Sequence, residues 1–200
     1  MNIKLKITAA LAVVVAFVFN ICGFAADCAQ VRRDVLRLHV VGASDSEFDQ
    51  QLKLKVRDAV LEQGGVIFNG TVTADEAEKI ITPRVTELKA VAEAVLLENG
   101  CDYTVDITVG EEYFSTRCYE KFTMPAGVYT AVRVNIGSAE GKNWWCVMFP
   151  PLCLPAATAD ADAFFTDDEM KVVSSSPEYE PRFKIVEIIE SIRNKLQNAS

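Results

Sequence analysis

The sequence LRLHVVGASDS, residues 36–46, decides the fold because it joins a strand pattern directly to the start of a helix. Leu36, Leu38 and Val40 alternate with polar residues, which predicts a strand over 34–41 with one apolar face. The strand is expected to stop at the glycine that follows it. The folded part of the chain is therefore predicted to open with a strand and then a helix.

The predicted helix begins within the same stretch. Residues 44–47 fit a capping box, in which the Ser44 hydroxyl accepts a hydrogen bond from the amide of Glu47. Two glycines at 64–65 are expected to end this helix. Its apolar residues recur at helical spacing and form one stripe: Phe48, Leu52, Val56, Ala59 and Val60.

Further helices and then strands follow. Residues 73–76 repeat the capping-box pattern, and the helix they begin should kink or restart near Pro83 and stop at Asn99-Gly100. The last strand is so apolar that we expect it in the centre of a sheet. This order predicts an α+β domain, with the N-terminal strand and helices packed on a mostly antiparallel sheet. Strands are predicted over 103–109, 116–123, 128–136 and 144–149.

The N-terminus carries an export signal. Lys4 and Lys6 precede an apolar run over 7–19, so residues 1–25 are interpreted as a signal peptide or an N-terminal anchor. Small residues at 23 and 25 favour cleavage before Ala26. The run is short for a spanning helix, which needs about 20 apolar residues, but the uncleaved anchor remains the alternative. Residues 26–154 are predicted to form one domain.

Two segments follow that domain. Residues 155–180 are rich in Ala, Asp and Ser and are predicted to be an acidic connector. Residues 181–200 are predicted to be a C-terminal amphipathic helix, which Pro181 begins. We expect its stripe to dock on the chain's own domain, with a partner or a membrane surface as alternatives. The stripe consists of Phe183, Ile185, Ile188, Ile189, Ile192 and Leu196.

The charge of the chain limits its partners. It has 28 acidic and 20 basic residues, a formal net charge of −8. Phosphate binding needs a basic face, so no nucleic-acid partner is expected. Anionic lipid should also repel the exported part, and membrane association is therefore expected through the N-terminus or a protein partner.

The residue types give little support for an enzyme active site. His39 is the only histidine, which excludes zinc sites built from several histidines and leaves a Cys–His pair with Cys146 or Cys153 as the conceivable nucleophilic site. No Cys-x-x-Cys motif supports a redox role. We therefore predict no catalytic, cofactor-binding or metal site and no small-molecule substrate.

The cysteines allow a disulfide. Cys146 and Cys153 are separated by Pro150-Pro151, which could turn the chain enough to join them. A bridge between Cys101 and Cys118 is the less favoured pairing. The other interpretation is that the cysteines are small buried residues with free thiols.

Two stretches resemble the signature segments of the stage II sporulation protein R family. They are LRLHVVGASDS running into QLKLKVRDAV at 51–60, and GKNWWCVMFPPLC at 141–153. The resemblance covers about residues 34–154. It implies a non-enzymatic, forespore-made protein, exported into the space between the forespore and mother-cell membranes. There it would activate a membrane-embedded aspartic protease that processes the precursor of the early mother-cell sigma factor.

Two other functions stay open: an envelope structural protein without a receptor, and a Cys-dependent hydrolase. For the signalling function the predicted partner-binding residues are Lys142, Asn143, Trp144 and Trp145. The two tryptophans are adjacent, so in a strand they point to opposite faces. Tryptophan is frequent at binding hot spots, although a purely structural role for both remains the alternative.

Overall fold

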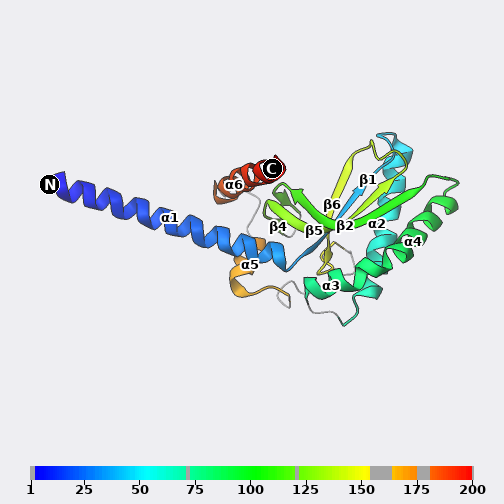
Figure 1. Ribbon diagram of the computed structural model, residues 1–200, viewed down its shortest axis with the longest axis horizontal. Helices are drawn as coiled ribbons and strands as arrows, with labels where there is room; N and C mark the ends of the chain where they lie inside the picture. The colour runs from blue at the N-terminus through cyan, green and yellow to red at the C-terminus, as the bar shows by residue number, and fades with distance from the viewer. Residues whose placement is uncertain (1–2, 71–72, 120–121, 154–163, 175–180, 200) are drawn as a thin grey trace. The chain divides into compact units, whose positions relative to one another are not determined.

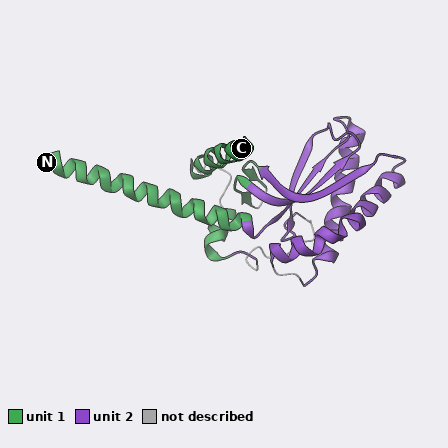
Figure 2. Ribbon diagram, viewed as in Figure 1, with its two compact units in different colours: residues 1–32, 114–127, 166–200 green, residues 33–113, 128–165 purple. Residues whose placement is uncertain are grey.

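The computed structural model describes residues 3–70, 73–119, 122–153, 164–174 and 181–199. The chain divides into two compact units (Figure 2). The larger unit comprises residues 33–113 and 128–165, and the smaller one comprises residues 1–32, 114–127 and 166–200. The segments predicted as signal region and C-terminal helix therefore belong to the same unit.

The larger unit contains a four-stranded sheet in the order β2-β5-β1-β6 (Figure 1). The strands are β1 (Leu36–Val41), β2 (Val105–Phe114), β5 (Gly127–Ile136) and β6 (Asn143–Phe149). β1 runs parallel to β5 and antiparallel to β6. The sheet is mixed and mostly antiparallel, which confirms the predicted α+β class.

β1, and not β6, is the strand buried on both sides. The prediction of a central strand at 144–149 was wrong, because β6 lies at one edge of the sheet. All six residues of β1 are buried, including Arg37 and His39 on its supposedly polar face. Arg37 Nε donates to the carbonyl of Cys146 at 2.8 Å, and its guanidinium lies 4.9 Å from the ring centroid of Tyr129. The hydrogen bond and the contact with the ring offset the cost of burying the guanidinium charge.

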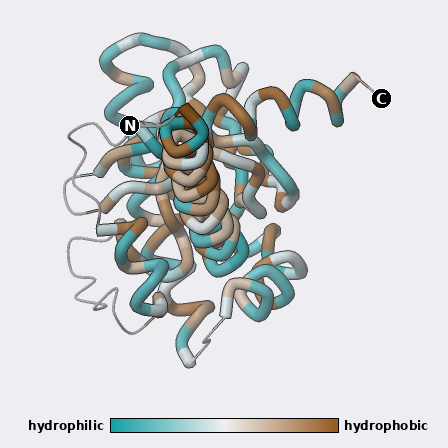
Figure 3. The backbone as a smooth tube through the Cα atoms, turned by 90° about the vertical axis from the view of Figure 1, so that its left-hand side faces the viewer, coloured by the Kyte–Doolittle hydropathy of each residue, from teal (hydrophilic) through white to brown (hydrophobic). Residues whose placement is uncertain are grey.

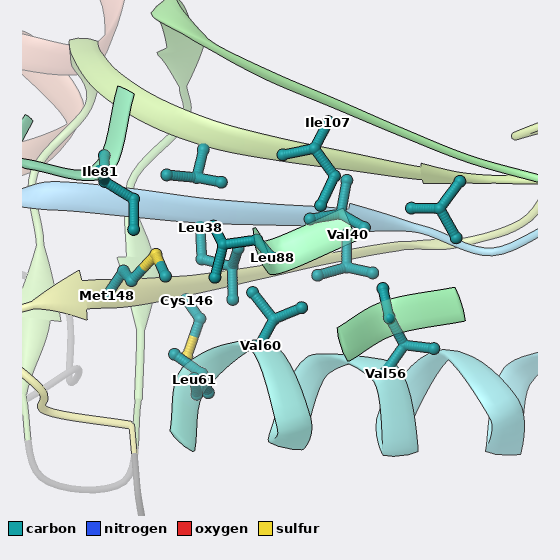
Figure 4. Packing of buried hydrophobic residues seen from close by; sticks show 14 of the residues in the cluster. Leu38, Val40, Val56, Val60, Leu61, Ile81, Leu88, Ile107, Cys146 and Met148 are labelled. Atoms are coloured by element: carbon teal, nitrogen blue, oxygen red, sulfur yellow. The ribbon is translucent and has the colours of Figure 1, made fainter. Parts of the chain in front are cut away.

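Helices α2 (Glu47–Ile67), α3 (Ala74–Ile81) and α4 (Val85–Glu98) pack on one face of this sheet (Figure 1). A 3₁₀ turn at Thr82–Arg84 carries Pro83 between α3 and α4, which confirms the predicted restart. The core forms where β1 faces these helices. Figure 4 shows side chains from β1, α2 and β6 meeting there, among them Leu38, Val40, Val56, Val60 and Met148.

Both predicted ends of the first helix were wrong. The N-cap of α2 is Ser46, whose hydroxyl accepts from the amide of Asp49 at 3.1 Å. Ser44 instead donates to the Asp49 carboxylate, and its hydroxyl accepts from the amide of Ser46. α2 also continues through Gly64-Gly65 to Ile67. A Cβ on Gly64 would lie 2.6 Å from Met148 Cε, so at this glycine α2 packs closely against the Met148 side chain of β6.

The strand predicted over 116–123 was also wrong as one element. Two short strands, β3 (Arg117–Cys118) and β4 (Thr123–Met124), pair antiparallel in a sheet of their own. Because the two strands run in opposite directions, alternation over eight positions could not describe the segment. Both strands belong to the smaller unit.

The smaller unit includes α1 (Ile3–Arg33), α5 (Asp167–Val173) and α6 (Pro181–Gln197). α1 is long and apolar enough to cross a membrane, a test that an N-terminal signal sequence also passes. It continues through the expected cleavage site before Ala26, and its second half buries Phe24, Cys28 and Val31. The centroids of the Phe24 and Phe183 rings are 5.0 Å apart, so α6 packs against α1.

α5 lies inside the predicted connector, whose sequence pattern had indicated no helix. Thr166 and Glu169 form a capping box at its start. Residues 155–163 and 175–180 of the predicted connector lie outside the described residues. The C-terminal helix is confirmed, but its stripe is only partly docked: Phe183 is buried, whereas Ile188, Ile189, Ile192 and Leu196 are exposed.

Candidate partner-binding surface

The two signature stretches of the sequence lie side by side in the larger unit. β1 from the first stretch pairs with β6 from the second, which places Trp144 opposite Val40 and Trp145 opposite His39. Val40 belongs to the core beneath the helices, whereas His39 is on the other face. The two tryptophans therefore leave β6 on opposite faces, as the alternation of a strand predicts.

The segment that enters β6 is fastened to the first turns of α2 and the loop before them. The amide of Gly141 donates to the carbonyl of Gly42 at 2.9 Å. The amide of Lys142 donates to Asp45 Oδ1 at 2.7 Å, while its carbonyl accepts from Lys53 Nζ at 2.9 Å. These bonds fix the backbone on both sides of Lys142, so its exposed side chain projects from a rigid base.

Lys53 lies beneath this segment with a buried side chain. Burial lowers the pKa of its ammonium, and the charges of Arg57 and Lys142 lower it further, while Asp45 acts in the opposite direction. Its Nζ also donates to Gln50 Oε1 at 2.6 Å. Lys53 thus links α2 to the start of β6 through hydrogen bonds rather than through an exposed ion pair.

Trp144 is the exposed aromatic residue of this segment, with 37% of its surface accessible. The guanidinium of Arg57, on α2, lies 4.4 Å from its ring centroid. A cation at this distance over an indole is attracted by the ring and limits its motion. Trp144 therefore presents a large apolar surface to solvent in a held orientation, a combination found at binding hot spots.

On the other face, Trp145 stacks on His39, with ring centroids 5.3 Å apart and planes at 15°. His39 Nδ1 donates to Glu112 Oε1 at 2.7 Å, and Nε2 lies 2.8 Å from Asn143 Oδ1. Arg133 Nη1 donates to the same Glu112 oxygen at 3.0 Å. These five side chains, with His39 at the centre, link β1, β2, β5 and β6 on the face opposite the helices.

The carboxylate of Glu112 is stabilised in its charged form. Burial by itself would raise its pKa, but hydrogen bonding and charge from His39 and Arg133 outweigh burial and hold the pKa below the ordinary value. Glu112 is therefore ionised at neutral pH and orients the imidazole of His39. This geometry supports a role in holding the sheet together.

The four predicted partner-binding residues are consecutive and lie at the start of the edge strand. Lys142, Asn143 and Trp144 are exposed, whereas Trp145 is half-buried against His39. No pattern in the sequence identifies Arg57, Glu112 or Arg133 as members of this surface or its supporting network. The only available signal was that Arg133 occupies a polar position in an alternating strand, which does not identify its partners.

The cysteines of the second stretch are held together. Cys146 and Cys153 lie at disulfide distance, with Cα atoms 6.3 Å apart, as predicted. Cys146 faces the core beneath the helices, on the face opposite His39, so the Cys–His pair of the hydrolase hypothesis is not assembled. Cys101 and Cys118 carry free thiols.

In the part of the chain that the structure describes, no three residues of the types His, Cys, Asp and Glu gather where they could hold a metal ion. What the described residues of this surface offer is therefore shape, an exposed indole and fixed charges.

Comparison with known proteins agrees with the resemblance carried by the two stretches. A family model described as stage II sporulation protein R (spore_II_R) matches residues 32–159, which include β1 and β6 but not α6. The curated stage II sporulation protein R of Bacillus subtilis (strain 168) is 36% identical over 118 residues, 59% of this chain and 53% of that protein. The match thus spans about half the length of this relative. No solved structure matches the chain.

Proposed function

The chain belongs to the stage II sporulation protein R family, and from this premise we propose that it is an exported signal protein of endospore formation. It acts in the space between the forespore and mother-cell membranes. There it activates a membrane-embedded aspartic protease that processes the precursor of the early mother-cell sigma factor. The N-terminal apolar helix supports export, either as a signal peptide or as a retained anchor.

One observation carries the proposal: Trp144 is exposed on a segment whose backbone is fixed by Gly42, Asp45 and Lys53. A protein activates a receptor by binding its active state more tightly than its inactive state, and needs no chemistry of its own. A held, exposed indole beside the basic Lys142 can provide such differential binding. It loses little conformational freedom when a partner covers it.

The test replaces Trp144 by Ala in sporulating cells and follows the sigma-factor precursor by immunoblot. If Trp144 is a hot spot, affinity falls by about 2 kcal/mol or more, roughly thirtyfold, and unprocessed precursor accumulates. Leu97→Ala is the matched control, because Leu97 is a 69% exposed apolar residue on α4 of the same unit. The control should process the precursor as the wild type does.

Immunoblots of the protein itself show whether both variants are made and exported in equal amounts. Normal processing with Trp144→Ala would contradict this binding surface but leave the signalling role intact. Normal processing in cells that lack the whole gene would contradict the signalling role.

A further inference from the structure

α6 has two opposite apolar sides, and only one of them is docked. Phe183 and Val186 are 8% and 2% exposed, whereas Ile188, Ile189 and Ile192 are 51%, 46% and 55% exposed. With 3.6 residues per turn, Ile188 and Ile192 lie opposite the buried pair, and Ile189 lies beside them on the flank nearer Val186. Leu196 extends their stripe by another turn and is 66% exposed.

Charge is sorted around the same helix. The two acidic residues, Glu187 and Glu190, lie on the docked side, and Glu190 is 8% exposed. By helical position the four basic residues flank the isoleucine stripe, two along each border. Those on one border are Lys184 and Lys195, and those on the other are Arg182 and Arg193. Lys184 and Arg193 also pair with Glu187 and Glu190 of the same helix, at 3.2 and 3.0 Å. An apolar stripe bordered by cations is the pattern of helices that lie in a lipid–water interface.

α6 is attached to α1 just beyond the part of α1 that could lie in a membrane. The Phe183 ring packs edge-on against Phe24, and the guanidinium of Arg182 lies 4.5 Å from the centroid of the same Phe24 ring. The exposed apolar run of α1 ends near Phe19, which precedes Phe24 by about 7.5 Å of helix. Arg32 adds an ion pair to Glu190 at 3.3 Å.

Figure 3, viewed nearly along α1, shows α6 extending sideways from it towards the C label, with hydrophobic and hydrophilic positions alternating. A helix fixed at this point on an apolar anchor is held within reach of the lipid headgroups. The negative net charge of the chain predicted repulsion from anionic lipid. Net charge does not show how charge is distributed, and α6 carries basic residues along both borders of its apolar stripe.

We propose that the isoleucine stripe of α6 docks on the surface of the bilayer that α1 enters, with its basic borders on anionic headgroups. The occupant of this face is lipid rather than a protein. The inference does not depend on protease activation, and α6 lies outside the region matched by the family model.

The test uses the full chain reconstituted into phosphatidylcholine–phosphatidylglycerol vesicles whose acyl chains carry bromine, which quenches nearby tryptophan. Ile192→Trp places a reporter in the stripe. Gln197→Trp is the matched control, because Gln197 is exposed and lies on the other side of the helix. The wild-type protein gives the background emission of Trp144 and Trp145, which is the same in every variant. Circular dichroism verifies the helix content of each variant.

Bromine should quench the added emission of Ile192→Trp at least about threefold more strongly than that of Gln197→Trp. In phosphatidylcholine alone the difference should shrink by about twofold or more, because the basic borders lose their partners. Equal quenching at both positions would overturn the proposal. A blue-shifted Ile192→Trp emission without lipid quenching would also overturn it, since a second copy of the chain or another protein segment would then cover the stripe.

Discussion

The indole of Trp145 lies stacked on the imidazole of His39 across the β1–β6 pair, with a centroid separation of 5.3 Å. Because His39 also bonds to Glu112 and approaches Asn143, one side chain joins three others that come from distant parts of the sequence. The buried histidine of this protein is therefore the centre of a structural network. This relationship underlies the first two predictions.

Replacing His39 by Ala should lower the free energy of unfolding by about 1–3 kcal/mol, because Glu112 loses a buried donor and Trp145 loses its stacking partner. Urea unfolding, followed by circular dichroism, measures the change. Lys142→Ala serves as the control, since its side chain is exposed and its hydrogen bonds come from the backbone. At temperatures where the His39 variant is folded, sigma-factor processing should continue; loss of processing by a folded, exported variant would revive the enzymatic hypothesis.

Acid should weaken the same network through Glu112. Its pKa is lower in the folded state than its ordinary value, so its stabilising contribution is fully present above the ordinary value. The contribution starts to fall below about pH 5, near the ordinary range of glutamate, and is lost as the pH passes below the folded-state value. Unfolding free energies measured from pH 7 to pH 3 should decline less steeply for Glu112→Gln than for the wild type.

Glu111→Gln provides the comparison for this pH series, because it removes the exposed neighbouring carboxylate. It should retain the wild-type slope. If Glu112→Gln also retained that slope, the contribution of Glu112 to acid sensitivity would be refuted.

Gly141→Ala should disturb the base of the candidate binding surface. A Cβ at Gly141 would overlap the backbone carbonyl of Ser44 and approach the carbonyl oxygen of Gly42 to 2.9 Å. Backbone cannot move aside as a side chain can, so we expect a loss of about 1–3 kcal/mol or more in urea unfolding. Gly110→Ala, whose Cβ would meet nothing within 4 Å, should be nearly neutral. Equal stability of the two variants would show that the loop at Ser44 adapts.

Breaking the link between Cys146 and Cys153 should destabilise the end of β6. The two residues are seven apart, and closing so short a loop is expected to contribute about 2 kcal/mol by restricting the unfolded chain. Cys153→Ser should therefore unfold at a lower urea concentration than the wild type. Cys118→Ser, which removes an exposed free thiol, is the control. Treatment with a reductant should bring the wild type to the midpoint of Cys153→Ser, and an unchanged midpoint would contradict the bridge.

Local pattern predicted much of this architecture. Alternation located β5, and the residues around Pro83 and Asn99-Gly100 located the helix break and the end of α4. These features depend on neighbours within a few positions of the chain, where steric and hydrogen-bonding preferences act directly. The boundaries of α2 were missed because Ser44 and Ser46 offer competing caps, and because the glycines at 64–65 do not end the helix, which packs there against Met148 on another element.

The sequence by itself determined the fold class, the apolar N-terminal helix, the family and the candidate segment 142–145. Only the tertiary structure decided that β6 is an edge strand, that His39 joins Glu112 and Asn143, and that α6 leaves three isoleucines exposed. The reason is physical. The apolar pattern of a segment indicates how much surface it must bury. The residues that bury this surface, or form hydrogen bonds with its polar groups, come from elsewhere in the chain.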